Sequence, residues 1–254
     1  MLVANKVFVV TGGASGLGKQ VVKSLVKEDG YVVIFDINVD LSIALVKRLG
    51  KKKVFFPGSV DVTSESQVKE ALSSAIQYFS NSHLCGAILC SGVLTPPLPM
   101  EGYGPNKSLT TFQQFKQLID INLLGTYNVA HKVSQVMIKN PEINNDGERG
   151  VIILVSSITG LDGNLVGYGT SKAAIAGLTL PLARELADHG IRVVCIAPGP
   201  IDTPMLKETN IQAPICLFPK RLGQPNEFAD SVVHIITNPM FNGSVIRLDG
   251  GLRA

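Results

Sequence analysis

Tyr168 and Lys172 are the two side chains in this sequence best suited to moving a proton. They lie in the stretch Tyr-Gly-Thr-Ser-Lys, which opens an apolar helical pattern. Residues four apart on a helix lie on one face, one turn from each other. A phenol is a poor base near neutral pH because its ordinary pKa is about 10, and a neighbouring ammonium lowers that pKa. The pair can therefore exchange a proton with an alcohol, although the spacing also fits an ordinary surface Tyr and Lys.

A glycine-rich loop near the start of the chain is the second candidate site. The apolar run 6–10 leads into residues 11–18, Thr-Gly-Gly-Ala-Ser-Gly-Leu-Gly, and an amphipathic helical pattern follows. A strand, a glycine turn and a helix present backbone N–H groups to a pyrophosphate, and glycine lets the backbone approach it closely. We therefore expect Gly12, Gly16 and Gly18 to bind the phosphates of a dinucleotide.

Acidic residues follow the next two strand-like segments. Asp36 ends the segment 31–35, about 20 residues after the glycines, where a carboxylate can accept hydrogen bonds from an adenosine ribose. It would repel the 2′-phosphate of NADP, and no Arg or Lys directly follows it. The cofactor we expect is therefore NAD. Asp61, followed by Val62, is either an adenine contact or an ordinary loop acid.

Asn122 lies among apolar positions of a long helical pattern that opens at Thr111. A buried amide requires hydrogen-bond partners. The Asn122 side chain therefore either makes a hydrogen bond that supports packing or takes part in a proton relay through water.

Composition argues against several other classes of protein. The 254 residues are 45% hydrophobic with a net charge of +3, and no apolar run approaches the roughly 18 residues of a membrane span. Basic residues are scattered apart from residues 51–53, which indicate a solvated turn rather than a nucleic-acid patch. The four cysteines and four histidines lack paired spacings, so we expect reduced thiols and no metal site. A strand pattern starts at Lys6, so we expect no secretory signal and no long presequence.

Strand-like and helical patterns alternate along the whole chain. The strand-like segments are 6–10, 31–35, 54–56, 84–90, 151–155, 191–197 and 244–248. This alternation predicts one α/β domain spanning 1–254, with a doubly wound, Rossmann-like, seven-stranded parallel sheet flanked by helices on both faces. Ligands bind beyond the carboxyl ends of such strands, where the candidate residues lie. Residues 93–108 and 140–149 form loop insertions, and apolar residues within about 200–222 fit a substrate lid.

Taken together, these motifs resemble the short-chain dehydrogenase/reductase family over essentially the whole chain. The matching residues are Thr11 to Gly18, Asp36, Asp61-Val62, Asn122, Ser157, Tyr168 to Lys172 and Pro198-Gly199. Further stretches, such as Asp61-Val-Thr-Ser-Glu and Asn242-Gly-Ser-Val-Ile-Arg-Leu-Asp-Gly, are similar to mitochondrial members of the family that act on 3-hydroxyacyl-CoA thioesters and hydroxysteroids.

The resemblance implies a role for each of these residues. Tyr168 would be the acid/base, Lys172 would bind the nicotinamide ribose, Ser157 would hydrogen-bond the substrate oxygen, and Asn122 would hold a water of the proton relay. The residues implied to bind NAD are Gly12, Ser15, Gly16, Leu17, Gly18, Asp36, Asp61, Val62, Cys90, Gly92, Tyr168, Lys172, Pro198, Ile201 and Thr203.

Two stretches depart from the family pattern. Residues 89–92 are Leu-Cys-Ser-Gly where the family often has Asn-Asn-Ala-Gly. The family's serine also usually lies two residues further from the tyrosine than Ser157 does. We assign Ser157 rather than Ser156 because Ser157 ends the strand pattern and leads into Ile-Thr-Gly. The turn before Tyr168 is then shorter, which alters one wall of the substrate site.

The resemblance implies an NAD-dependent oxidoreductase that interconverts a secondary alcohol and a ketone, with 3-hydroxyacyl-CoA/3-oxoacyl-CoA or a hydroxysteroid/ketosteroid as the substrate pair. Two alternatives stay open: a 3-oxoacyl thioester reductase of fatty-acid synthesis, whose usual NADPH Asp36 disfavours, and a catalytically silent NAD-binding regulatory subunit. The resemblance further implies a homotetramer, located in the mitochondrial matrix or in the cytoplasm.

Overall fold

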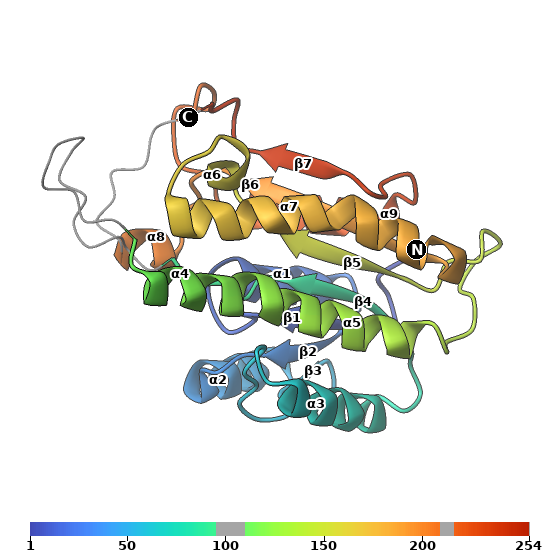
Figure 1. Cartoon of the computed structure of the whole chain (residues 1–254). Coiled ribbons are helices and arrows are strands. Elements are labelled where there is room, and N and C mark those ends of the chain that lie inside the picture. The colour runs from blue at the N-terminus through green and yellow to red at the C-terminus, as the bar shows by residue number, and fades with distance from the viewer. Residues whose placement is uncertain (95–109, 209–215, 254) are drawn as a thin grey trace, which may run out of the picture.

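Seven parallel strands form one sheet at the centre of the chain (Figure 1). The computed structural model describes residues 1–94, 110–208 and 216–253. In sheet order the strands are β3 (Val54–Phe55), β2 (Tyr31–Phe35), β1 (Val7–Thr11), β4 (Leu84–Leu89), β5 (Gly150–Val155), β6 (Ile191–Pro198) and β7 (Val245–Leu248). The predicted seven-stranded parallel sheet is confirmed. Most of the predicted insertion at 93–108 and the middle of the predicted lid lie outside the described residues.

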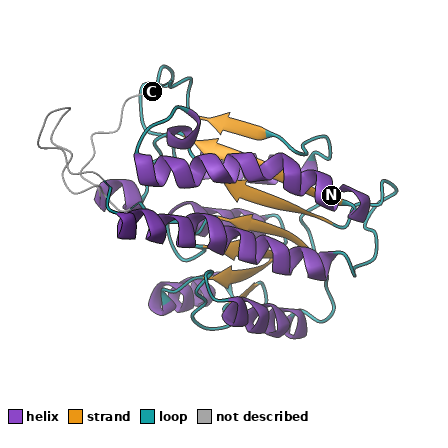
Figure 2. Cartoon of the chain, in the orientation of Figure 1, coloured by secondary structure: helices purple, strands orange, loops and turns teal. Residues whose placement is uncertain are grey.

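Helices cover both faces of the sheet (Figure 2). The helices are α1 (Gly16–Lys27), α2 (Val39–Leu49), α3 (Glu65–Tyr78), α4 (Phe112–Leu118), α5 (Thr126–Met137), α6 (Ile158–Leu161), α7 (Val166–Leu186), α8 (Pro204–Glu208) and α9 (Pro225–Thr237). Helices α3, α5 and α7 lie over the face turned to the viewer in Figure 1, and α1 packs beside α9 on the other. None of the helices among the described residues has the length and apolarity that crossing a bilayer requires.

Each strand of the sheet interior contributes to two hydrophobic cores. In β1, Val7 and Val9 pack with the α3, α5 and α7 side, while Phe8 and Val10 pack with the α1 and α9 side. All four side chains are buried. Successive residues of a strand point to opposite faces, so a strand covered on both faces must be apolar at every position. This explains why the strands appear in the sequence as continuous apolar runs.

The chain reverses its direction across the sheet between β1 and β4. From β1 it builds outward to β2 and β3, and then it returns to β4 on the other side of β1. The loops that leave β1 and β4 therefore diverge and open a crevice at the carboxyl edge of the sheet. This crevice contains the glycine-rich loop.

Three local features differ from the patterns expected from the sequence. Helix α7 begins at Val166, two residues before Tyr168, and the short helix α6 replaces part of the expected turn. The long helical pattern after Thr111 is divided by a π-helical segment, η1 (Ile119–Gly125), which contains Asn122. π-Helical turns inside α-helices occur frequently at functional sites.

Candidate active site

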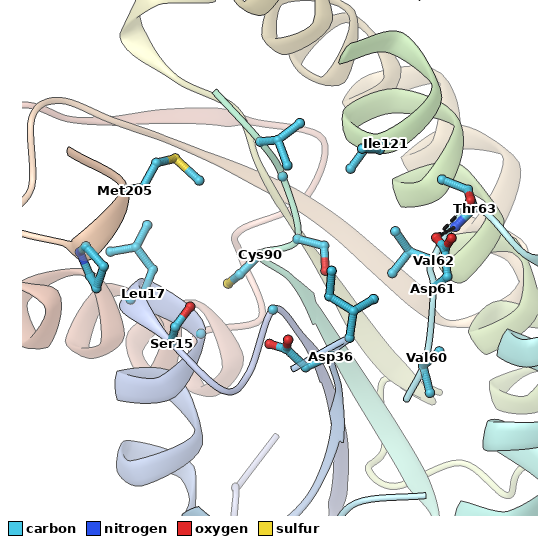
Figure 3. A pocket seen from close by; sticks show the side chains of 18 of the residues that line it. Ser15, Leu17, Asp36, Val60, Asp61, Val62, Thr63, Cys90, Ile121 and Met205 are labelled. Atoms are coloured by element: carbon cyan, nitrogen blue, oxygen red, sulfur yellow. Dashed lines mark hydrogen bonds between the residues drawn. The ribbon is translucent and has the colours of Figure 1, made fainter. Parts of the chain in front are cut away.

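A cavity of about 620 Å³ lies at the crevice between the ends of β1 and β4 (Figure 3). It brings together most of the residues predicted to bind the cofactor. These are Gly12, Ser15, Gly16, Leu17, Gly18, Asp36, Asp61, Val62, Cys90, Gly92 and Thr203. Figure 3 shows Ser15 and Leu17 on one side of this space and Asp61 and Val62 on the other, with Asp36 between them. The cavity is therefore long enough to contact side chains from several separate loops.

The glycine loop fits a phosphate-binding role by its backbone. Gly12 and Gly16 have φ angles of 62° and 48°, a region that side-chain-bearing residues rarely adopt. A side chain at Gly18 would collide with the backbone carbonyl of Gly12. Ser15 is the N-cap of α1, and its own side chain makes no capping hydrogen bond. The free N–H groups at this helix start are the type of donor that a pyrophosphate requires.

Asp36 is held in place by two backbone amides. Its Oδ2 accepts a hydrogen bond from the Ala14 N–H at 3.0 Å, and its Oδ1 accepts one from the Asn38 N–H at 2.9 Å. Each carboxylate oxygen keeps a further lone pair with which to accept a ribose hydroxyl. The charged residues among the described lining of this cavity are all aspartates. The residues present therefore fit NAD better than a cofactor with an additional phosphate.

Asp61 also lines the cavity, but its side chain is bound to its own loop. Its Oδ1 accepts hydrogen bonds from the Thr63 N–H at 2.9 Å and from the Thr63 hydroxyl at 2.8 Å. The N-cap of α3 is instead Ser64, whose side chain accepts from the Gln67 N–H. Asp61 thus shapes the turn beside the cavity, and its contact with adenine remains a prediction.

A second cavity of about 400 Å³ adjoins the first and contains the predicted proton-transfer residues. Ser157, Tyr168 and Lys172 line it, together with Pro198 and Ile201. Five residues line both cavities: Leu17, Cys90, Gly92, Thr203 and Met205. The two spaces therefore meet beside these five shared residues, and a group bound in the first cavity can reach a group bound in the second.

The Ser157 hydroxyl and the Tyr168 phenol line the same cavity, and Ser157 acts on the phenol as a hydrogen-bonding neighbour. Burial raises the pKa of the Tyr168 phenol to about 12, and the hydrogen bond with Ser157 opposes this rise. Burial also lowers the pKa of Lys172 to about 8. Both shifts have the same cause, which is the cost of a charge in a site shielded from water.

The position of Lys172 differs from the expectation that its ammonium lowers the pKa of Tyr168. The Nζ of Lys172 donates a hydrogen bond to the Val155 carbonyl at 2.9 Å and lies 5.7 Å from the centre of the Tyr168 ring. The pKa of Tyr168 rises because burial outweighs the favourable interactions. In the chain by itself, Ser157 rather than Lys172 is the group that favours the phenolate.

The two neighbouring serines point in different directions. The Ser156 hydroxyl is buried and donates to the backbone carbonyl of Lys172 at 2.6 Å. Ser157 contacts Tyr168 and is also the N-cap of α6. The partners of the two hydroxyls therefore differ, while the contact of Ser157 with a substrate oxygen remains a prediction.

Asn122 is completely buried and lines neither cavity. Its Oδ1 accepts from the Val93 N–H at 2.8 Å, and its Nδ2 donates to the Val93 carbonyl at 3.1 Å and to the Ser171 hydroxyl at 3.0 Å. Ser171 donates in turn to the Tyr168 carbonyl at 2.7 Å. The side chain therefore connects the segment after β4 to the start of α7, while its part in a water relay stays a prediction.

Sequence reasoning missed several residues that line the second cavity. Thr159 and the apolar side chains Leu94, Ile158, Leu165 and Leu206 belong to this group. Apolar residues in short loop segments carry no periodic signal, so nothing in the sequence marked them as lining a site. Among the residues described, no group of three or more His, Cys, Asp or Glu side chains is arranged to hold a metal ion.

Comparison with known proteins yields a consistent set of relatives. A family profile described as short chain dehydrogenase matches residues 6–214. The 3-hydroxyacyl-CoA dehydrogenase type-2 of Drosophila melanogaster is 41% identical over 260 residues, covering 99% of this chain and 99% of that protein. The human protein of the same name is 42% identical over 255 residues, covering 97% of this chain and 95% of its own.

A solved structure agrees with these relatives. The crystal structure of 3-hydroxyacyl-CoA dehydrogenase type-2 from Mycobacterium avium superposes with a TM-score of 0.86 at 36% identity. The match covers 98% of this chain and 96% of that one. The similarity therefore extends through both cavities and is not restricted to the glycine-rich half.

Proposed function

The chain belongs to the short chain dehydrogenase family, and we propose that it interconverts a 3-hydroxyacyl-CoA and the corresponding 3-oxoacyl-CoA with NAD as the cofactor. The observation that supports this most strongly is that Ser157, Tyr168 and the buried Lys172 line one cavity, which adjoins the cavity of the glycine-rich loop. A binding module without catalysis would not require a serine, a tyrosine and a buried lysine to be grouped beside a cofactor cavity.

Proton transfer is the task of Tyr168 in this proposal. NAD⁺, when bound, supplies the hydride acceptor and a positive charge near the phenol. Lys172, with the positive charge that bound NAD⁺ would add, would have to lower the Tyr168 pKa from about 12 before the phenolate could accept the alcohol proton near neutral pH. Ser157 donates a hydrogen bond to the substrate oxygen, and this bond strengthens as negative charge develops there. Lys172 would bind the ribose next to the nicotinamide.

The character of the second cavity supports an apolar substrate. Its apolar side chains include Leu94, Ile158, Leu165, Met205 and Leu206. Among the described residues that line it, Lys172 is the only Lys, Arg, Asp or Glu. An acyl chain or a steroid ring system fits such a lining. Helix α8 contributes Met205 and Leu206 from within the predicted lid, whose closure over the substrate is part of the proposal.

Cofactor preference in the proposal depends on Asp36. Its carboxylate would accept hydrogen bonds from the adenosine ribose and would repel a 2′-phosphate. The described lining of the larger cavity has no Lys or Arg to neutralise that phosphate. This argues against the alternative of an NADPH-dependent 3-oxoacyl thioester reductase of fatty-acid synthesis.

A spectrophotometric panel tests the proposed function. Purified protein is assayed with acetoacetyl-CoA and with two ketosteroids, each with NADH and with NADPH. We expect rapid oxidation of NADH with acetoacetyl-CoA and much slower turnover with NADPH. Turnover of ketosteroids alone would transfer the assignment to a hydroxysteroid dehydrogenase. No oxidation with any pair would favour the silent NAD-binding subunit.

Assembly and location are further parts of the proposal. We expect a homotetramer in the mitochondrial matrix, with the cytoplasm as the alternative location. Exposed apolar side chains on α4 and α7, such as Phe112 and Val166, would then contact another subunit. Light scattering that shows a stable monomer at micromolar concentration would contradict the tetramer, and cell fractionation distinguishes the two locations.

A further inference from the structure

Thr159 directs two hydrogen-bond donors at one atom, the Oγ of Ser157. The Thr159 hydroxyl donates to this oxygen at 2.9 Å, and the Thr159 backbone N–H donates to it at 3.2 Å. Thr159 lies in the first turn of α6, two residues after the N-cap Ser157, and it lines the smaller cavity. It is therefore placed to affect Ser157 without replacing it in contact with a substrate.

The hydrogen-bonding capacity of Ser157 is limited by the valence of its oxygen. A serine hydroxyl has two lone pairs that accept and one proton that it donates. Thr159 occupies both lone pairs. The capacity that remains to Ser157 is the donation of its one proton. The Tyr168 phenol, whose pKa the Ser157 side chain lowers, lines the same cavity and can accept that proton.

We propose that Thr159 is a positioning residue that orients the Ser157 hydroxyl proton, toward Tyr168 in the absence of substrate and toward the substrate oxygen once the substrate binds. This inference rests on the proposed function. A donor next to the phenol oxygen favours the phenolate, which is the form that accepts the proton of an alcohol. Hydrogen bonds in a chain also polarise one another, so donation from Thr159 makes Ser157 a stronger donor.

Removal of the Thr159 hydroxyl would remove the preference for the phenolate form of Tyr168. One lone pair of Ser157 would become free, and the protonated Tyr168 could then donate to it. That arrangement stabilises the neutral phenol rather than the phenolate. The active form of Tyr168 would then appear only at higher pH.

Few other groups can produce such a change at Tyr168. In the described lining of this cavity, the titratable groups besides Tyr168 are Lys172 from the same helix and Cys90 at the end of β4. Burial raises the pKa of Cys90 to about 12, so it remains a neutral thiol. The described parts of α6, β5 and the β6–α8 segment contribute no titratable side chain to this lining. A shift in the Tyr168 pKa that Thr159→Val causes is therefore attributable to the changed hydrogen bonding of Ser157.

The experiment compares Thr159→Val with Thr159→Ser in alcohol oxidation across pH. Valine keeps the shape and the backbone N–H but removes the hydroxyl, whereas serine keeps the donor. We expect Thr159→Val to move the rising limb of kcat/KM up by about 0.5–1 pH unit, the equivalent of one neutral hydrogen bond. Thr159→Ser should retain the wild-type limb, and the NADH dissociation constant should be unchanged in both variants. Thr237→Val, which alters an exposed hydroxyl at the end of α9, controls for the substitution itself.

Two further measurements separate this inference from the proposed function. In a Ser157→Ala background, Thr159→Val should cause no additional change, because Thr159 acts only through Ser157. Ultraviolet titration of the NAD⁺-saturated protein, with the Tyr168→Phe signal subtracted, follows the same phenol without any substrate. If neither the rising limb of kcat/KM nor the ultraviolet titration of Tyr168 moves in Thr159→Val, the role of Thr159 is overturned and the dehydrogenase assignment stays intact. An equal effect with and without Ser157 would also overturn it.

Discussion

The carboxylate of Asp162 forms two hydrogen bonds with the guanidinium of Arg247, at 2.7 and 2.8 Å. Asp162 follows α6, and Arg247 lies in β7. Asp249, which follows β7, also accepts a hydrogen bond from Arg247 at 2.6 Å. The hydrogen bonds to Asp162 help raise the pKa of Arg247 above its ordinary value. The pair therefore ties the short turn between Ser157 and Tyr168 to the last strand of the sheet.

Loss of this ion pair should loosen the turn and slow catalysis. Arg247→Met leaves the mostly buried Asp162 without its bidentate partner, which should reduce stability by roughly 1–3 kcal/mol. We expect kcat/KM to fall about tenfold, because small misplacements of reacting groups are costly. Arg253→Met is the matched control, since Arg253 also pairs with Asp249, at 2.9 Å, but follows the sheet instead of lying in β7. Equal effects of the two substitutions would contradict the anchoring role.

Ser157→Ala and Ser156→Ala should have opposite profiles. Ser157→Ala removes the hydroxyl that faces Tyr168, so kcat should fall at least about a hundredfold with a modest loss of stability. Ser156→Ala removes a buried hydrogen bond to the Lys172 carbonyl, so it should cost about 1 kcal/mol of stability with a smaller effect on kcat. Steady-state kinetics and urea unfolding of both variants check this. An inactive Ser156→Ala beside an active Ser157→Ala would reverse the assignment.

Asp36→Asn should weaken the discrimination between the two nicotinamide cofactors. In the wild-type chain, charge repulsion and lost ribose hydrogen bonds should disfavour NADPH by about 2–4 kcal/mol, tens- to several-hundredfold in kcat/KM. The amide is nearly isosteric but uncharged, so the ratio of kcat/KM for NADH to that for NADPH should fall at least about tenfold. Asp120→Asn, an aspartate elsewhere in the same cavity that pairs with Lys116, should leave most of the ratio intact. Equal use of both cofactors by the wild-type protein would contradict the role of Asp36.

Lys172→Met should stabilise the fold at neutral pH while abolishing activity. Burial lowers the pKa of Lys172 from 10.5 to about 8, so below pH 8 the folded chain carries a charge that would be better solvated in the unfolded chain. This destabilisation of the folded chain is present in full below about pH 8. It decreases between about pH 8 and 10.5, where the unfolded chain binds more protons than the folded chain does. We expect the variant to be more stable by roughly 1–3 kcal/mol at pH 7.

The pH dependence of this stability difference has a predicted direction. Between pH 8 and 9.5 the wild-type chain should regain about 2 kcal/mol relative to Lys172→Met. Urea unfolding of both proteins at the same pH values measures the difference and cancels the contributions of other groups. A difference in unfolding free energy that is constant from pH 7 to 9.5 would show that burial does not lower the pKa of Lys172.

The sheet and the cofactor cavity were predictable because their signals are local. Strands buried on both faces appear as apolar runs, and the glycine loop and Asp36 follow two of them directly. The Asp162–Arg247 pair was not predictable, because its partners are 85 residues apart and charged residues are common. Helix α6 was missed because its four residues are too few to show a helical period. The orientation of Lys172 depends on the Val155 carbonyl, which has no sequence signal.

The kinetics of Tyr168→Phe test the central claim most directly. Phenylalanine keeps the ring in place and removes the group that carries the proton. With acetoacetyl-CoA and NADH, we predict that kcat falls at least about a hundredfold while the NADH dissociation constant, measured by fluorescence, stays within about twofold of the wild-type value. A Tyr168→Phe protein that retains full kcat would contradict the assignment of Tyr168 as the acid/base and the catalytic mechanism built on it.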